Sequence, residues 1–327
     1  MIGIAIKGHG SATPASPLTN EALSTVVDTS DEWIRSRTGI CQRHLAPPDL
    51  SLTDLAVQAA QAAIVSCHLQ PTDLDLIILA TSTPDDLFGS AGLLQHRLGA
   101  TRAVAFDLTA ACSGFLFGLV TAAQFIQTGV YRRVLVVGAD MLSRWVDWND
   151  RATCVLFGDG AGAIVLEAST ENHLLGFELR TDGTQNPCLN LGYRGSAQRL
   201  TENIVISQGT YQPVTMNGKE VYRFAVQQVP EVLEKALFRA GLTIAEVDWL
   251  LLHQANQRIL DAVAERLHIP AAKVLSNLAH YGNTSAATIP LMLDEAIRAG
   301  QVKPGDTIAA SGFGAGLSWG AAIFRYG

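Results

Sequence analysis

A cysteine among small residues is the strongest candidate for chemistry in this sequence. Residues 105–118 lead from a short strand-like segment into a predicted helix that opens at Cys112. A helix N-terminus directs unpaired N–H groups and the positive end of its dipole toward such a side chain, and this lowers a thiol pKa. The sequence therefore predicts a nucleophile at Cys112, although cysteine is also often buried simply for packing.

Two polar residues in the second half of the chain are candidates to assist it. His253 directly follows the apolar run Trp-Leu-Leu-Leu, so we expect it at the carboxyl end of a strand, where open α/β sheets place their sites. Asn283 lies in Tyr-Gly-Asn-Thr-Ser-Ala-Ala. The structural alternatives are a packed histidine and a helix-capping asparagine. The glycine-rich segment 311–317 is either a tight turn or a source of backbone N–H groups for an oxyanion site.

Strand-like apolar segments alternate with helical ones, which predicts an α/β fold with buried central sheets. The two halves, split near residue 170, repeat this order with similar spacing, and a true repeat would place Cys112 and Asn283 at equivalent points of a pseudo-twofold arrangement. Generic β/α alternation is the alternative explanation for so loose a similarity. Three long connections interrupt the pattern, and long loops in a compact chain are often functional. The predicted strands are 75–82, 133–140, 162–167, 248–254, 306–314 and 319–324, and the connections are 28–49, 142–153 and 180–217.

The composition excludes several classes of protein. The chain has 327 residues, of which 48% are hydrophobic and 16% charged, and its formal net charge of −7 argues against nucleic-acid binding. No apolar run reaches the ~18–20 residues that span a membrane, and the N-terminus is typical of a first strand, not of a signal peptide. The scattered cysteines predict neither a disulfide framework nor a metal site, which fits the cytoplasm. They are Cys41, Cys67, Cys112, Cys154 and Cys188.

Several motifs, in order, resemble those of the thiolase-fold condensing enzymes, and most closely the β-ketoacyl-acyl-carrier-protein synthase III family. They are Thr-Ser-Asp-Glu-Trp-Ile around Trp33, Ala-Cys-Ser-Gly at Cys112, Phe-Gly-Asp-Gly-Ala-Gly at 157–162, His-Gln-Ala-Asn at His253, the segment around Asn283, and the closing Gly-Phe-Gly-Ala-Gly. The resemblance covers essentially the whole chain. It implies a thiolase-like fold of duplicated βαβαβαββ halves, 1–170 with the cysteine and 171–327 with the histidine and asparagine, in five α-β-α-β-α layers.

The resemblance also implies a reaction. Cys112 attacks a starter acyl-CoA, with acetyl-CoA expected, and the backbone N–H groups of Cys112 and Ala315 hold the oxyanion. Most relatives carry glycine at the position of Ala315. His253 and Asn283 then stabilise the enolate that malonyl-acyl carrier protein forms on losing CO2, and the product is a β-ketoacyl thioester that initiates fatty acid synthesis. No metal or redox cofactor is implied, and a related enzyme of specialised polyketide synthesis is the alternative.

Further roles follow from the resemblance alone. Trp33 and Arg151 are expected to sandwich the adenine of CoA, with Arg37 at its phosphates. Gly218 and Asn256 are further CoA contacts, while Lys219 stands where relatives often have asparagine. The acyl pocket is expected to include Leu142, Phe157 and Phe88, the last reaching across a homodimer interface.

The implied protein partner is the acidic acyl carrier protein. Arg223 and Arg258 match positions that dock it, Arg266 is a third candidate, and Glu265 departs from the basic residue expected there. Solvated surface charge is the alternative for all three arginines. Two other classes of function use similar residues: a papain-like acyltransferase or hydrolase, and a non-catalytic subunit, whose usual mark is a replaced nucleophile.

Overall fold

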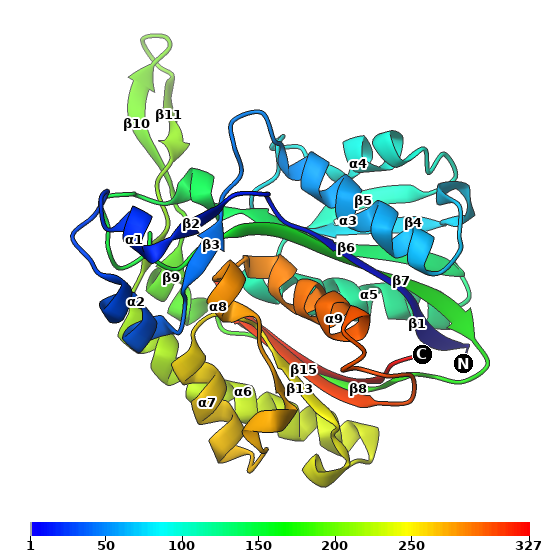
Figure 1. The fold of residues 1–327 in the computed structure, drawn as a ribbon. Coiled ribbons are helices and arrows are strands. Elements are labelled where there is room, and N and C mark those ends of the chain that lie inside the picture. The colour runs from blue at the N-terminus through cyan, green and yellow to red at the C-terminus, as the bar shows by residue number, and fades with distance from the viewer. Residues whose placement is uncertain (1) are drawn as a thin grey trace.

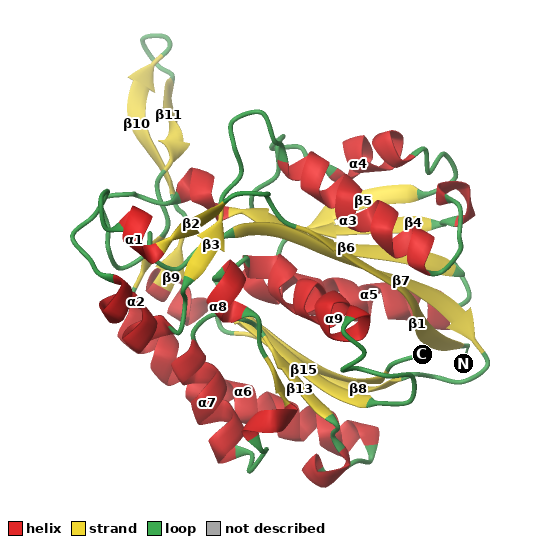
Figure 2. Ribbon diagram, viewed as in Figure 1, coloured by secondary structure: helices red, strands yellow, loops and turns green. Residues whose placement is uncertain are grey.

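Two five-stranded mixed sheets carry the fold of this protein, whose computed structural model describes residues 2–327 (Figures 1 and 2). The first sheet has the strand order β1-β7-β6-β4-β5 and the second β8-β16-β15-β13-β14. The first consists of β1 Gly3–Ala12, β4 Leu76–Ala80, β5 Val104–Leu108, β6 Arg133–Met141 and β7 Asp159–Ser169, and the second of β8 Leu174–Thr181, β13 Trp249–Leu252, β14 Val274–Leu275, β15 Thr307–Gly314 and β16 Ser318–Arg325.

The second sheet repeats the first strand for strand. In each, three neighbouring strands run parallel and the other two run antiparallel to their neighbours. Parallel strands need crossover connections, and helices α3, α4 and α5 provide them in the first half as α6, α7 and α9 do in the second. The predicted duplication of βαβαβαββ units is confirmed. These helices are α3 Leu52–Ser66, α4 Ala91–Leu98, α5 Gly114–Gln127, α6 Gly218–Ala240, α7 Gln257–Arg266 and α9 Thr288–Arg298.

The sheets and helices form five layers. Helices α5 and α9 lie between the two sheets, and each contacts strands of both (Figure 1). Helices α3 and α4 cover the outer face of the first sheet, while α6 and α7 cover that of the second. The expected α-β-α-β-α arrangement is confirmed.

Local sequence explains why these elements form. Strand β4 is apolar and buried at every position, as a strand covered on both faces requires. Helix α3 begins at a capping box, in which Ser51 Oγ accepts a hydrogen bond from Asp54 N–H and the Asp54 carboxylate accepts one from Ser51 N–H. Helices α5 and α9 are apolar on more than one side because a sheet covers each side.

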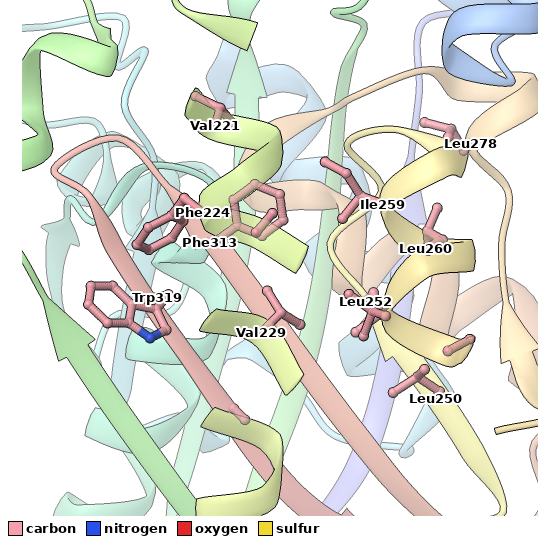
Figure 3. Close-up of a cluster of buried hydrophobic side chains, with 14 of the residues drawn as sticks. Val221, Phe224, Val229, Leu250, Leu252, Ile259, Leu260, Leu278, Phe313 and Trp319 are labelled. Atoms are coloured by element: carbon pink, nitrogen blue, oxygen red, sulfur yellow. The ribbon is translucent and has the colours of Figure 1, made fainter. Parts of the chain in front are cut away.

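A cluster of buried hydrophobic side chains packs helices α6 and α7 against the second sheet. Figure 3 shows side chains of α6, α7 and β13 converging there with Phe313 and Trp319. Phe224 and Trp319 meet edge to face with ring centroids 5.0 Å apart, a favoured aromatic geometry. This packing fixes α6 and α7, whose first turns border the candidate site.

The long connections carry smaller elements. The segment 180–217, expected as one connection, contains a hairpin whose residues are all exposed and which projects from the body (Figure 1). Residues 28–49 contain a helix that begins at the cap Ser30 and includes Trp33. The small elements are β2 Pro17–Thr19, α1 Asn20–Leu23, α2 Asp31–Thr38, β3 Gln42–His44, β9 Leu189–Asn190, the hairpin strands β10 Tyr193–Arg199 and β11 Val205–Tyr211, β12 Thr215–Met216 and α8 Leu278–Tyr281.

Candidate active site

One cavity of about 1550 Å³ brings the three candidate catalytic residues together. Cys112, His253 and Asn283 all line it, although they come from separate parts of the chain. Within residues 2–327 no cluster of His, Cys, Asp and Glu has the composition of a metal site. In the same range no helix is both long and apolar enough to cross a membrane.

Cys112 lies in the 3-10 turn Ala111–Ser113, directly before α5. The turn begins at Ala111 in the left-handed region, with φ of 48°, a conformation that places a sharp bend before the sulfur. The thiol is buried, and this burial raises the pKa of Cys112 to about 12. The expectation that this pKa is lowered was wrong, because the loss of water around the sulfur disfavours the thiolate.

The N–H groups of Cys112 and Ala315 were expected to form an oxyanion site, and the structure brings the segment around Ala315 close to Cys112. A Cβ added at Gly314 would lie 2.6 Å from Cys112 N, so the absence of a side chain lets the end of β15 approach the nucleophile closely. Ala315, the next residue, lines the cavity and has no positive φ, so alanine is tolerated there. Among the described residues, neither the Cys112 nor the Ala315 N–H has a backbone acceptor outside regular elements.

His253 follows β13 directly, as predicted, and its N–H donates to Ser311 O at 2.8 Å. Burial lowers the pKa of His253 to about 3, so the imidazole is neutral near pH 7. The ring meets Phe313 edge to face, with centroids 5.3 Å apart. A neutral imidazole donates a hydrogen bond through its protonated nitrogen and accepts one through the other nitrogen, so its role toward a substrate depends on which nitrogen carries the proton.

The Thr288 hydroxyl controls which of these two roles is available. Its oxygen lies 2.8 Å from His253 Nδ1 and 3.0 Å from the carbonyl oxygen of Ser285. A hydroxyl carries one proton, so it can donate to only one of them. Donation to Nδ1 leaves the proton of the neutral ring on Nε2, whereas donation to the carbonyl requires the proton on Nδ1.

Asn283 is held by both its backbone and its side chain. Its N–H donates to Leu156 O at 2.9 Å, and its C=O accepts from Gly158 N–H at 3.0 Å, which forms a parallel bridge with Phe157. The carboxamide oxygen accepts from Ser285 N–H at 2.9 Å. This bond fixes the orientation of the amide, and the NH2 group remains as a donor.

The structure corrects the expected symmetry of the site. In the second half, the 3-10 turn Ser285–Ala287 precedes α9 just as Ala111–Ser113 precedes α5. Both turns begin with a left-handed residue, since φ is 52° at Ser285. The counterpart of Cys112 is therefore Ala286, and Asn283 lies three positions earlier, in the segment bridged to Phe157. Spacing alone could not distinguish these positions.

All the expected CoA contacts except Arg151 line the same cavity. Trp33, Arg37, Gly218 and Asn256 line it, as does Lys219. Asn256 caps α7 and its carboxamide donates to Arg37 O at 3.0 Å. Arg151 lies over Trp33 with its guanidinium carbon 4.8 Å from the ring centroid.

The other expected site residues divide between the cavity and the surface. Leu142 and Phe157 line the cavity, whereas Phe88 is fully exposed on this chain. Arg258 lines the cavity and lies over Tyr222, with 5.9 Å between the guanidinium carbon and the ring centroid. Arg223 pairs with Glu220 at 3.0 Å, and Arg266 donates to Val226 O at 3.3 Å.

The sequence analysis did not identify three residues that contact the candidate catalytic residues or hold the segment around them. Thr288 contacts His253, and Ser285 contacts both Cys112 and Asn283. Asp140, at the end of β6, accepts hydrogen bonds from Ala286 N–H and Thr83 Oγ and holds the turn after Asn283. The density of hydroxyl residues in the motif Asn-Thr-Ser-Ala-Ala-Thr was the available signal for the first two.

Comparison with known proteins identifies the family. Two models of 3-oxoacyl-[acyl-carrier-protein] synthase III match, one at residues 106–183 and a C-terminal one at 237–326. The beta-ketoacyl-[acyl-carrier-protein] synthase III of Trichormus variabilis is 69% identical over 100% of this chain and 99% of its own length. That of Acaryochloris marina is 68% identical over 99% of this chain and 98% of its own.

Solved structures agree with these matches. The 3-oxoacyl-[acyl-carrier-protein] synthase III of Aquifex aeolicus has a TM-score of 0.91 at 44% identity, over 99% of this chain and 100% of that one. The priming beta-ketosynthase of the R1128 polyketide pathway has a TM-score of 0.91 at 34% identity, over 99% of this chain and 96% of that one. The chain belongs to the 3-oxoacyl-[acyl-carrier-protein] synthase III family.

Proposed function

We propose that this chain condenses a starter acyl-CoA with malonyl-acyl carrier protein, with loss of CO2, and so initiates fatty acid synthesis. As a member of its family the chain is an acyltransferase. The observation that carries the proposal is the convergence of Cys112, His253 and Asn283 on one cavity that Ala315 also lines. The high identity to synthase III relatives favours this reaction over specialised polyketide synthesis.

Acylation is the first half-reaction. The Cys112 thiolate attacks the thioester carbonyl of the acyl-CoA, and the Cys112 and Ala315 N–H groups stabilise the tetrahedral oxyanion. The intermediate collapses to an acyl thioester on Cys112, and CoA leaves as the thiol with the proton that the cysteine loses. The sulfur is buried, so the thiolate forms in a site from which water is largely excluded, where these N–H donors are more effective than in water.

Decarboxylation and condensation form the second half-reaction. The malonyl thioester loses CO2, and the electron pair of the broken C–C bond forms an enolate. Neutral donors suit this intermediate: His253 with its proton on Nε2, and the NH2 group of Asn283. This role requires the Thr288 hydroxyl to donate to His253 Nδ1. The enolate carbon then attacks the acyl carbonyl, a new C–C bond forms, and Cys112 is released.

The surroundings of the cavity suit the expected substrates. Leu142 and Phe157 contribute apolar surface for the acyl group to the cavity that Cys112 also lines, and we expect acetyl-CoA as the starter. Arg37 and Lys219 supply positive charge for the CoA phosphates. These steps call for no metal or redox cofactor.

We also infer a homodimer of a cytoplasmic enzyme. Phe88 is fully exposed, and β5, an edge strand of the first sheet, begins with the exposed Val104. An exposed aromatic side chain near an unpaired strand edge is a common feature of an interface. Sedimentation at micromolar concentration would refute this inference if it showed an active monomer of 34.8 kDa. We further propose that the chain consists of two thiolase-like halves, residues 1–170 and residues 171–327.

Acylation of the cysteine gives a direct test of the proposed function. Incubation with acetyl-CoA should add one acetyl group to the protein, located at Cys112 by peptide mass mapping. The Cys112→Ser variant should remain unmodified, while Cys67→Ser, a matched change outside the cavity, should be acetylated normally. Addition of malonyl-acyl carrier protein should then discharge the acetyl group as a β-ketoacyl product. Acetylation that persists in Cys112→Ser would refute the assignment.

A further inference from the structure

Ser285 contacts Cys112 and Asn283 directly and is linked to His253 through Thr288. Its hydroxyl donates to Cys112 Sγ at 3.3 Å. Its N–H donates to the Asn283 carboxamide oxygen at 2.9 Å, and its carbonyl lies 3.0 Å from the Thr288 hydroxyl that contacts His253. The residue is 2% exposed and adopts a left-handed conformation with φ of 52°. Non-glycine residues rarely adopt this conformation, and such strain is typical of functional sites.

The hydroxyl is well placed to act on the nucleophile. Within residues 2–327 it is the side chain that hydrogen-bonds to the sulfur, and no such bond joins Cys112 to His253. Two effects disfavour the thiolate: burial, and the charge of nearby Asp140. The Ser285 hydroxyl also faces the Asp140 carboxylate and carries one proton. When it donates that proton to Cys112 Sγ it opposes both effects, because it stabilises the anionic sulfur more than the neutral thiol.

We propose that Ser285 is a further catalytic residue, whose hydroxyl stabilises the Cys112 thiolate during acylation while its backbone orients Asn283 for decarboxylation. The inference rests on the proposed function for the substrates, but the bond to sulfur does not depend on them. The two contacts belong to different atoms of one residue. Removal of the hydroxyl should therefore impair the first half-reaction and spare the second.

The expected size of the effect follows from the bond. Hydrogen bonds to charged groups are typically worth a factor of about 10 to 100 in an equilibrium. The Cys112 pKa should accordingly rise by about one to two units when the hydroxyl is lost. A higher thiol pKa also makes the remaining thiolate more nucleophilic, with a Brønsted coefficient of about 0.4–0.5. Alkylation of Cys112 at a fixed pH below its pKa should then slow by about 3–10-fold.

The experiment compares alkylation rates between matched variants. Cys112 in Ser285→Ala is alkylated with iodoacetamide over a range of pH and followed by peptide mass mapping. Ser113→Ala is the control, because Ser113 is buried beside Cys112 but its hydroxyl faces the carbonyl oxygens of Ala110, at 2.6 Å, and Ser318, at 3.2 Å, and not the sulfur. Ser285→Gly removes the same hydroxyl and tolerates the positive φ without strain, so it reports the hydroxyl even if the alanine variant folds poorly.

Each outcome supports or overturns the proposal. We expect about 3–10-fold slower alkylation and slower acetylation in both Ser285 variants, with Ser113→Ala within twofold of the unmodified protein. Malonyl thioester decarboxylation should be retained in Ser285→Ala, since its N–H still holds Asn283. Alkylation at the original rate in both Ser285 variants, or an equal loss of both half-reactions, would overturn the proposal. If Ser285 controls alkylation but acetyl-CoA never acylates the unmodified protein, the inference stands and the proposed function fails.

Discussion

The guanidinium of Arg151 lies directly over the indole of Trp33, 4.8 Å from its centroid, and also donates to Asp28 O at 3.0 Å. A planar ring between them would need a separation of about 7–8 Å, twice an ordinary van der Waals contact. Arg151 thus covers the face of Trp33 that the resemblance assigns to adenine. If adenine binds between the two side chains, as we propose, Arg151 has to move.

We predict that Trp33 and Arg151 contribute unequally to CoA binding. Trp33→Ala removes the stacking surface and should weaken CoA binding by about 10-fold or more. Arg151→Ala also removes a contact, but it frees the face of Trp33 from a cation-π interaction of about 0.5–1 kcal/mol. Its net effect should therefore be smaller, within about threefold. Calorimetric titration with CoA measures both, and Arg35→Ala, on the same helix as Trp33 and paired with Asp31, is the control. A larger loss in Arg151→Ala would contradict this order.

His253 and Asn283 should matter more to decarboxylation than to acylation of Cys112. In the proposed mechanism their donors stabilise the enolate, and the loss of one oxyanion donor typically costs about 10²–10³ in rate. His253→Ala and Asn283→Ala should therefore accept an acetyl group from acetyl-CoA at rates much closer to that of the unmodified protein. Release of CO2 from malonyl thioester and the rate of acetylation are measured separately. Equal loss of both rates would contradict the division of roles.

Thr288 should act through the proton position of His253. Thr288→Val keeps the shape of the side chain but removes the hydroxyl that faces Nδ1, so nothing favours the tautomer that donates from Nε2. We expect decarboxylation to slow by about 10-fold, while acetylation of Cys112 changes little. Thr284→Val is the control, because Thr284 is buried in the same motif but does not bond to His253. An unchanged decarboxylation rate in Thr288→Val would show that His253 needs no such partner.

Much of the fold was predictable because its pattern is local. Continuous apolar runs predicted β4, β6 and β15 close to their observed bounds, since buried strands must be apolar on both faces. The hairpin β10–β11 was missed, because its strands are exposed along their whole length and so lack a hydrophobic pattern. The repeat of strand order was predictable from spacing, but the exact counterpart of a single residue was not.

Site residues were predictable from the sequence where the residue type itself suggests a chemical role. They were less predictable where the role comes from contacts with other side chains in the folded protein. The sequence singled out Cys112, His253 and Asn283, which the structure places around one cavity. It did not indicate that Ser285 bonds to the sulfur, because a serine in a small-residue motif has many equivalent uses. The direction of the Cys112 pKa was also wrong, since burial depends on the packing of β15 and of the turn Ser285–Ala287, both from the other half of the chain.

Acidification should destabilise the protein partly through His253. Its folded-state pKa is about 3 instead of the ordinary 6.5, so between these values the unfolded chain binds a proton that the folded chain does not. The free energy of unfolding should therefore fall as the pH drops below 6.5, by about 2 kcal/mol from this group at pH 5. Urea denaturation at pH 7.5 and pH 5 should show a smaller decrease in His253→Gln, whereas His96→Gln, at an exposed site, should behave like the unmodified protein. An equal decrease in His253→Gln would contradict the depressed pKa.

Carrier-protein docking should depend more on Arg258 than on Arg223. The charge of Arg223 is partly neutralised by Glu220 at 3.0 Å, whereas Arg258 has no ion-pair partner within residues 2–327 and lies at the cavity. A rim charge acts mainly on encounter, so Arg258→Glu should raise the KM for malonyl-acyl carrier protein by about 3–10-fold and leave acetylation of Cys112 intact. Arg223→Glu and Arg266→Glu should have smaller effects.

Salt provides the check on this docking prediction. The chain has a net charge of −7, so it repels an acidic partner at long range, and the local attraction by Arg258 must exceed this repulsion at contact. Exposed charges are screened over about 10 Å at 0.1 M salt, so the KM of the unmodified protein should rise with salt and that of Arg258→Glu should rise less. If the Arg258→Glu variant keeps both the original KM and its salt dependence, the carrier protein docks on another face. Glu265, which stands where a basic residue was expected, would then be evidence that the basic docking surface does not include α7.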